Sequence, residues 1–193
     1  CTFPGLMTSW TDAFQHTSLF GGTDAVSAAT PMAMLHGGEL PDLTLGQMLL
    51  GQHGGAFGGV PVLMLILGGV YLLSRRVISP RAPLAYLGTV ALLTFLFPRG
   101  DGSALDWMVA QLCSGGLMMG AIFMASDYTT TPVAPLGQTL FGVGCGLLTV
   151  LLRYFGSYPD GVGWAILTMN CCVWLLDRAA VPRRFGVGRF ALV

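Results

Sequence analysis

The side chains best suited to take part in a chemical reaction lie in one short polar segment, which combines a carboxylate with two hydroxyls. Its sequence is Asp24-Ala-Val-Ser27-Ala28-Ala29-Thr30-Pro31. A threonine hydroxyl is a nucleophile once a base activates it, and the small residues before Thr30 leave that oxygen accessible. The segment also suits a structural role, with Thr30 as an N-cap, Pro31 as the first helical residue, and Asp24 and Ser27 in a turn. These residues alone leave both interpretations open.

A second polar cluster follows an apolar run and consists of Asp127, Thr129, Thr130, Thr131 and Pro132. One interpretation is a loop with helix caps, which these residue types favour. The other is the rim of a polar pocket, since an acidic group at the end of a membrane helix is a functional candidate.

The cysteines and histidines do not have the spacing of a metal site. Four of the five cysteines lie in apolar runs without a Cys-x-x-Cys pair, which is typical of buried small hydrophobic residues. The three histidines are scattered through a polar region without i, i+4 pairing. These residues are Cys113, Cys145, Cys171 and Cys172, and His16, His36 and His53. We therefore predict no metal site.

The composition is that of an all-α integral membrane protein. Hydrophobic residues make up 53% of the chain and charged residues 9%, with a mean hydropathy of +0.70. A soluble domain carries roughly 25% charged residues to cover its surface. Lipid is therefore the expected surrounding, and the net charge of zero gives no indication of nucleic acid as a partner.

The hydropathy pattern divides the chain into three regions. Residues 1–58 form a polar, Gly-rich segment, and residues 179–193 form a basic tail. The Gly-rich run 45–59, at the end of the polar segment, has a re-entrant hairpin as an alternative interpretation. Between them, residues 59–178 form a five-helix membrane domain. Its apolar runs are near 59–75, 84–98, 105–126, 136–153 and 161–177. Several runs are shorter than the 20 or so residues that a span needs.

Arginines predict the orientation of these helices. Those after the first run (75, 76, 81) and after the fifth (178, 183, 184, 189) belong on the cytoplasmic side. Residues 1–58, 99–103 and 156–160 are then outside and 127–135 inside, with Arg99 and Arg153 as exceptions to the charge rule at the outer face.

Small and polar residues inside the runs predict contacts between helices. Gly116 and Gly120 stand four apart, as do Gly142 and Gly146, which favours packing seams over clearance for a cofactor. Gln111 and Asn170 each need a hydrogen-bond partner in the bundle or a ligand.

Several stretches besides residues 24–31 carry a family resemblance. They are Gly68-Gly-Val-Tyr-Leu-Leu73, Ser114-Gly-Gly-Leu-Met-Met-Gly-Ala-Ile-Phe-Met-Ala-Ser-Asp127-Tyr-Thr-Thr-Thr-Pro132-Val, Arg153-Tyr-Phe-Gly-Ser-Tyr-Pro159-Asp-Gly-Val, Ile166-Leu-Thr-Met-Asn170 and Leu176-Asp177-Arg178. Together they closely resemble the family of the D subunit of the Rnf electron-transport complex and its sibling, the B subunit of the sodium-translocating NADH:quinone oxidoreductase. The resemblance runs from about Asp24 to Gly186 and implies that this chain is the C-terminal half to two-thirds of a longer subunit. The start at Cys1, without an initiator Met, fits that expectation.

The resemblance implies a covalent flavin. In that family the motif D-x-x-[ST]-[GA]-A-T is where a flavin transferase splits FAD and leaves FMN as a phosphoester on the terminal threonine, here Thr30. Asp24 and Ser27 match recognition positions, and Ala28 and Ala29 keep the site small. Many relatives have Gly in place of Ala28, which changes little. A non-covalent flavin, such as riboflavin, or a coupling ion near Asp127 is a further expectation.

One further departure from the family pattern and two rival functions remain. Around Gly58-Gly59-Val60 relatives more often carry Gly-Glu-[ST], so a carboxylate is absent here.

The resemblance implies a ten-helix fold that consists of two inverted repeats and is similar to urea channels. This chain would be the second of the two repeats. It also implies a role in a ferredoxin:NAD oxidoreductase that exports sodium or protons across the bacterial inner membrane, with the A, B, C, E and G subunits of the Rnf complex as partners. The rival functions are a channel or permease and a scaffold without a redox role.

Overall fold

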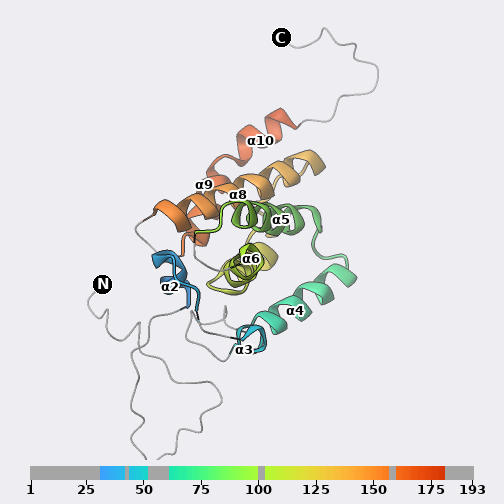
Figure 1. Cartoon of the computed structure of the whole chain (residues 1–193). Coiled ribbons are helices and arrows are strands. Elements are labelled where there is room, and N and C mark those ends of the chain that lie inside the picture. The colour runs from blue at the N-terminus through green and yellow to red at the C-terminus, as the bar shows by residue number, and fades with distance from the viewer. Residues whose placement is uncertain (1–30, 42–43, 52–60, 100–102, 157–159, 181–193) are drawn as a thin grey trace, which may run out of the picture.

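All of the regular secondary structure in the described part of the chain is helical. A computed structural model describes residues 31–41, 44–51, 61–99, 103–156 and 160–180 (Figure 1). The helices are α2 (Pro31–Gly37), α3 (Leu45–Leu50), α4 (Val62–Ser74), α5 (Arg81–Leu96), α6 (Ala104–Cys113), α7 (Leu117–Met119), the π-helix η1 (Gly120–Met124), α8 (Pro135–Phe155), α9 (Val162–Cys171) and α10 (Val173–Ala179). The prediction of an all-α protein is confirmed for these residues.

The helices match the predicted apolar runs in position, but not all of them are single helices. α4, α5 and α8 coincide with the first, second and fourth runs, and α8, with 21 residues, is long and apolar enough to cross a membrane by itself. The third run is broken, because α6 and the α7–η1 helix meet at 67°. The fifth run divides at Cys172 into α9 and α10. The described helices are thus consistent with a helical membrane protein, while five complete spans and an inverted repeat stay predictions.

The residues between α6 and α7 explain the break in the third run. Ser114 has an extended backbone, and Gly115 has a φ of +71°, in the left-handed region that an L residue avoids. Two consecutive non-helical residues end the hydrogen-bond ladder of α6, and a new helix starts after Gly116. The run stays apolar across this point, so hydropathy gave no indication of it.

The glycines of α8 form a packing seam against α5, as predicted. A Cβ atom added to Gly142 would lie 2.5 Å from the carbonyl oxygen of Ala82, and one added to Gly146 would lie 2.7 Å from Cβ of Thr89. In the third run, a Cβ on Gly120 would collide with Val162 of α9. The small residues therefore let backbones approach closely, which is how helices gain packing in lipid.

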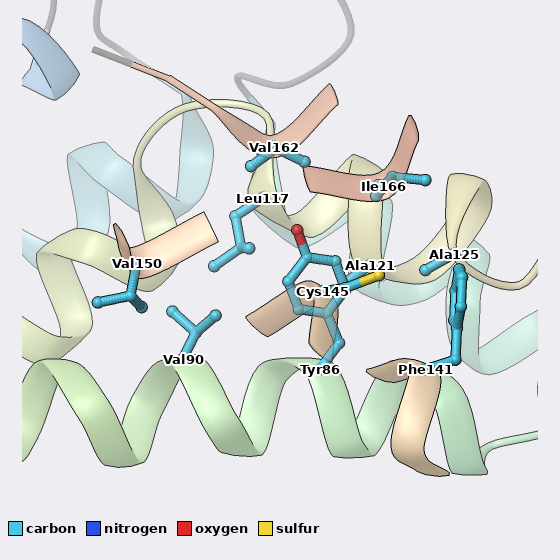
Figure 2. Packing of buried hydrophobic residues seen from close by; sticks show 10 residues of the cluster. All are labelled: Tyr86, Val90, Leu117, Ala121, Ala125, Phe141, Cys145, Val150, Val162 and Ile166. Carbon is cyan, nitrogen blue, oxygen red and sulfur yellow. The ribbon is translucent and has the colours of Figure 1, made fainter. Parts of the chain in front are cut away.

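Two apolar clusters form the core. The larger joins α5, η1, α8 and α9, with Tyr86 and Phe141 among its largest side chains (Figure 2). The smaller joins α2 and α3 to α4 and α6, and it includes the fully buried Trp107 together with Leu35, Met48 and Val62. Of the four cysteines in the runs, Cys113 and Cys145 are buried as predicted, whereas the same prediction is wrong for Cys171, which is exposed at the end of α9.

The bundle has two distinct ends. The α2 end holds helix α2, Arg99 after α5, the break between α6 and α7, and the C-terminus of α8, because His36 contacts Arg153 and Gly38 lies against Arg99. At the opposite end the loop before α8 contacts α10, through the amide of Val133 and the carboxylate of Asp177. α2 therefore lies with Arg99 and Asp160, as the predicted topology requires, while the side of the membrane that it faces stays a prediction.

Candidate functional site

The predicted attachment motif precedes the first described helix. Asp24, Ser27, Ala28, Ala29 and Thr30 lie outside the described residues. The described part of the chain starts with α2 at Pro31, and Pro31, Met32 and Leu35 are buried on the bundle. Helix α2 is thus fixed to the membrane domain from its first described residue.

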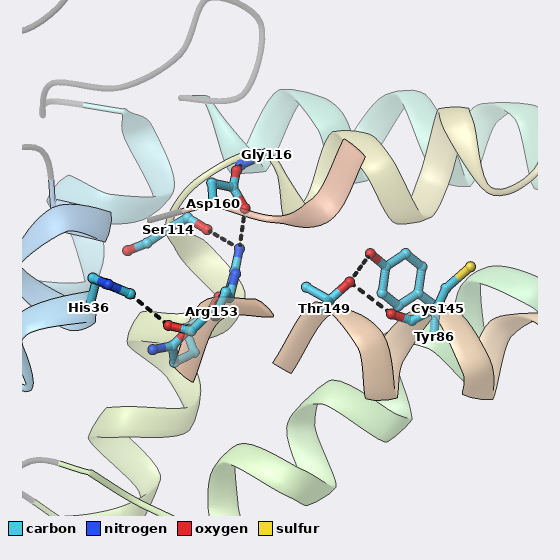
Figure 3. A network of polar contacts seen from close by, with 9 residues as sticks. His36, Tyr86, Ser114, Gly116, Cys145, Thr149, Arg153 and Asp160 are labelled. Carbon is cyan, nitrogen blue, oxygen red and sulfur yellow. Dashed lines mark hydrogen bonds and ion pairs between the residues drawn. The ribbon is translucent and has the colours of Figure 1, made fainter. Parts of the chain in front are cut away.

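The same end of the bundle contains a buried arginine at the break between α6 and α7 (Figure 3). The side chain of Arg153, at the end of α8, is fully buried. Its Nη1 donates to the carbonyl oxygen of Gln111 at 2.7 Å and to the Gln111 side-chain oxygen at 3.0 Å. Its Nη2 donates to the carbonyl oxygen of Ser114 at 3.2 Å. The guanidinium therefore satisfies backbone acceptors that the end of α6 leaves free.

Asp160 completes this arrangement from the start of α9. Its Oδ1 lies 3.3 Å from Arg153 Nη2, and its Oδ2 accepts a 2.7 Å hydrogen bond from the amide of Gly116. The carboxylate thus neutralises the arginine and also satisfies a free amide at the start of α7. Backbone groups at the end of α6 and at the start of α7 therefore both have hydrogen-bond partners. Non-helical backbone within a bilayer needs such partners, because lipid offers none.

The last carbonyls of α8 are capped by other segments. His36 Nδ1 lies 2.7 Å from the carbonyl oxygen of Arg153. Because a carbonyl only accepts, Nδ1 of His36 carries a proton. Arg99 donates to the carbonyl oxygen of Tyr154 and lies over the Tyr154 and Phe155 rings. The two arginines that broke the charge rule are therefore engaged at the α2 end, Arg153 inside it and Arg99 on its surface.

Sequence reasoning identified Gln111 correctly and missed Arg153. The prediction that Gln111 needs a partner in the bundle is confirmed, because its side chain accepts from Arg153. Asn170 differs, since its buried side-chain oxygen has no hydrogen-bond partner among the described residues. An available signal for Arg153 was a lone arginine in the last turn of a long apolar run, paired with an acidic residue seven positions later.

Asp127 forms a local turn at the opposite end. Its carboxylate accepts a 2.7 Å hydrogen bond from the Thr129 hydroxyl, and its carbonyl accepts one from the Thr131 hydroxyl at 2.6 Å. Hydrogen bonds from Thr129 lower the pKa of Asp127 below its usual value. These contacts are those of a polar loop, and a contact between Asp127 and a cofactor or ion stays a prediction.

Replacing Thr129 by valine should raise the pKa of Asp127 toward its ordinary value. The side-chain hydrogen bond is the largest cause of the lowering, and valine removes it while keeping the shape. Thr129→Ser keeps the hydroxyl and serves as the control. A carboxyl ¹³C titration of specifically labelled protein measures both, and equal titration of the two variants would contradict the assignment.

Replacing Gly115 by alanine should destabilise the α2 end. The left-handed backbone costs an L residue about 1–2 kcal/mol. The added Cβ would also lie 2.9 Å from Asp160 Oδ2 and 3.1 Å from Arg153 Nη2. Gly163→Ala on α9 is the matched control, because nothing lies within 4 Å of its Cβ position. Thermal unfolding of the full-length subunit in detergent should show a lower Tm for the first variant alone.

The comparisons of this sequence with known proteins all point to the same protein family. The family model described as NQR2, RnfD, RnfE family matches residues 1–186, so the match also covers the residues before Asp24. The chain is 37% identical to the D subunit of the Na(+)-translocating ferredoxin:NAD(+) oxidoreductase complex of Acetobacterium woodii, over 94% of this chain and 56% of that protein.

Two further relatives give the same result. The chain is 37% identical to the D subunit of the proton-translocating ferredoxin:NAD(+) oxidoreductase complex of Clostridium ljungdahlii, over 95% of this chain and 59% of that protein. It is 35% identical to the D subunit of the ion-translocating oxidoreductase complex of Stutzerimonas stutzeri, over 92% and 53% respectively. The chain thus spans between half and three-fifths of the length of these relatives. With the family model matching nearly its whole length, this chain belongs to the NQR2, RnfD, RnfE family.

Proposed function

We propose that this chain is the C-terminal part of a membrane electron-carrier subunit that holds FMN covalently on Thr30. The observation that carries the proposal is the motif Asp24-Ala-Val-Ser27-Ala28-Ala29-Thr30, in a chain of this family, directly before a helix fixed to the membrane domain. The relatives are named as D subunits of ion-translocating oxidoreductase complexes, which supports a role in such a complex. The names specify sodium in one relative and a proton in another.

The described residues fit a tethered cofactor at this position. Leu35 is 1% exposed and Met32 4%, and His36 bonds to the end of α8, so the segment after Thr30 has little freedom to move. A flavin attached covalently next to a fixed helix stays near one place, and the covalent bond removes most of the entropy cost of binding. FMN, when attached, supplies one-electron chemistry, and this chain's task is to hold and position it.

In the proposed attachment reaction, Thr30 supplies the attacking oxygen, and a separate enzyme, the flavin transferase, supplies the catalytic base. The Thr30 oxygen forms a bond to the FMN phosphorus of FAD, the diphosphate bond breaks, and AMP leaves with the bonding electrons. The hydroxyl proton passes to a base on the flavin transferase. Small side chains at positions 28 and 29 leave room for that enzyme.

Mass spectrometry of the full-length subunit tests the proposal. Co-produced with its flavin transferase, the subunit should carry one added FMN phosphoester mass, located on the peptide that contains Thr30. Protein made without the transferase is the control and should lack that mass. An unmodified Thr30 peptide in both samples would exclude the electron-carrier role and favour a permease or a scaffold.

A further inference from the structure

We propose that the break between α6 and α7 is a site for a monovalent cation, and that its occupant is the guanidinium group of Arg153 in the same chain. The break lies more than eighty residues along the chain from the flavin motif, and the proposal does not depend on the flavin. It concerns what stabilises the interrupted helix at the α2 end (Figure 3).

Four oxygen atoms line this site around the two Nη nitrogens of Arg153. Two are main-chain carbonyls at the end of α6, from Gln111 and Ser114, and the other two are the Gln111 side-chain oxygen and Asp160 Oδ1. All four lie between 2.7 and 3.3 Å from Arg153 nitrogens. Carbonyl, amide and carboxylate oxygens are the groups that hard cations bind, and the C-terminal end of a helix adds partial negative charge.

The charges of the site balance with a single positive occupant. Asp160 supplies one negative charge, and the buried Arg153 supplies one positive charge at 3.3 Å. A free cation entering beside the guanidinium would add a second positive charge that no carboxylate of the site balances, which is strongly unfavourable in a region of low dielectric constant. The tethered cation therefore excludes a mobile one from this break.

The occupant also connects the break to α2. The side chain of Arg153 is held by α6 and Asp160, while its own carbonyl accepts the hydrogen bond from His36 of α2. One residue thus links the interrupted helix, the end of α8 and the first described helix. Loss of the guanidinium should loosen all three segments together.

Chemical rescue tests whether the site binds a cation. We expect Arg153→Ala in the full-length subunit, purified in detergent, to lower the Tm by on the order of 10 °C. Millimolar guanidinium chloride should restore a large part of this loss in a saturable way. Choline chloride at equal ionic strength should not, because choline is too large and donates no N–H hydrogen bonds. Arg178→Ala is the control, since Arg178 lies over the exposed Trp174 ring, and its Tm should not respond to guanidinium.

The proposal fails if guanidinium and choline have equal effects on Arg153→Ala, or if guanidinium stabilises the wild type equally. A second pair of variants decides the case in which Arg153→Ala gives no folded protein. Arg153→Lys keeps a positive charge, whereas Arg153→Met keeps the length without charge. We expect folded, monodisperse protein from the lysine variant and a several-fold lower yield from the methionine variant. A methionine variant as abundant and as stable as the lysine variant would overturn the proposal, because packing alone would then suffice.

Discussion

Replacing Thr30 by valine should abolish the covalent flavin completely. Valine has almost the same shape as threonine but lacks the hydroxyl whose oxygen would form the phosphoester. The full-length subunit, produced with its flavin transferase and denatured in a gel, should give a fluorescent flavin band for the wild type and none for Thr30→Val. Thr30→Ser keeps the hydroxyl and should retain a band.

The same variant separates the two interpretations of Thr30 that the sequence left open. If Thr30 acts only as the N-cap of α2, valine costs about 1 kcal/mol of stability and no flavin band exists in the wild type either. If Thr30 carries the flavin, the band disappears while the membrane domain stays folded, because Met32, Leu35 and the contact from His36 to Arg153 remain. A band that persists in Thr30→Val would place the flavin on another residue and reject the assignment.

Replacing Gly142 by alanine should destabilise the membrane domain by about 2 kcal/mol, the usual scale of overpacking. Its Cβ would lie 2.5 Å from the Ala82 carbonyl oxygen, 2.8 Å from Ala85 Cβ and 3.0 Å from the Tyr86 amide nitrogen. Two of these atoms belong to the backbone of α5, which cannot rotate away as a flexible side chain does. α5 must therefore retreat along the seam, and contacts around Tyr86 are lost with it.

Gly88→Ala is the matched control for this prediction. Gly88 lies on α5, is exposed, and has nothing within 4 Å of the position that a Cβ atom would take. Alanine is favoured over glycine in a helix by about 1 kcal/mol, so this variant should keep or raise the Tm. Thermal unfolding in detergent measures both variants. Equal Tm values for Gly142→Ala and Gly88→Ala would show that the seam is not tightly packed.

Residue types alone located several local features. The apolar runs gave the positions of α4, α5 and α8, because a helix in lipid needs a continuous apolar surface. The pair Gly142 and Gly146 indicated the seam, although not its partner α5, because a bare helix face can receive any neighbouring helix.

The sequence by itself indicated the helical membrane class and the family, and it predicted an attachment motif, because these depend on residue types and their spacing along the chain. Only the tertiary structure decided that the third run is broken and that Arg153 fills the break. Two of the four oxygens around its guanidinium are backbone carbonyls, from residues 39 and 42 positions away. A carbonyl is present in every residue, so no pattern of side chains marks which ones a fold will leave unpaired and bring to a buried charge.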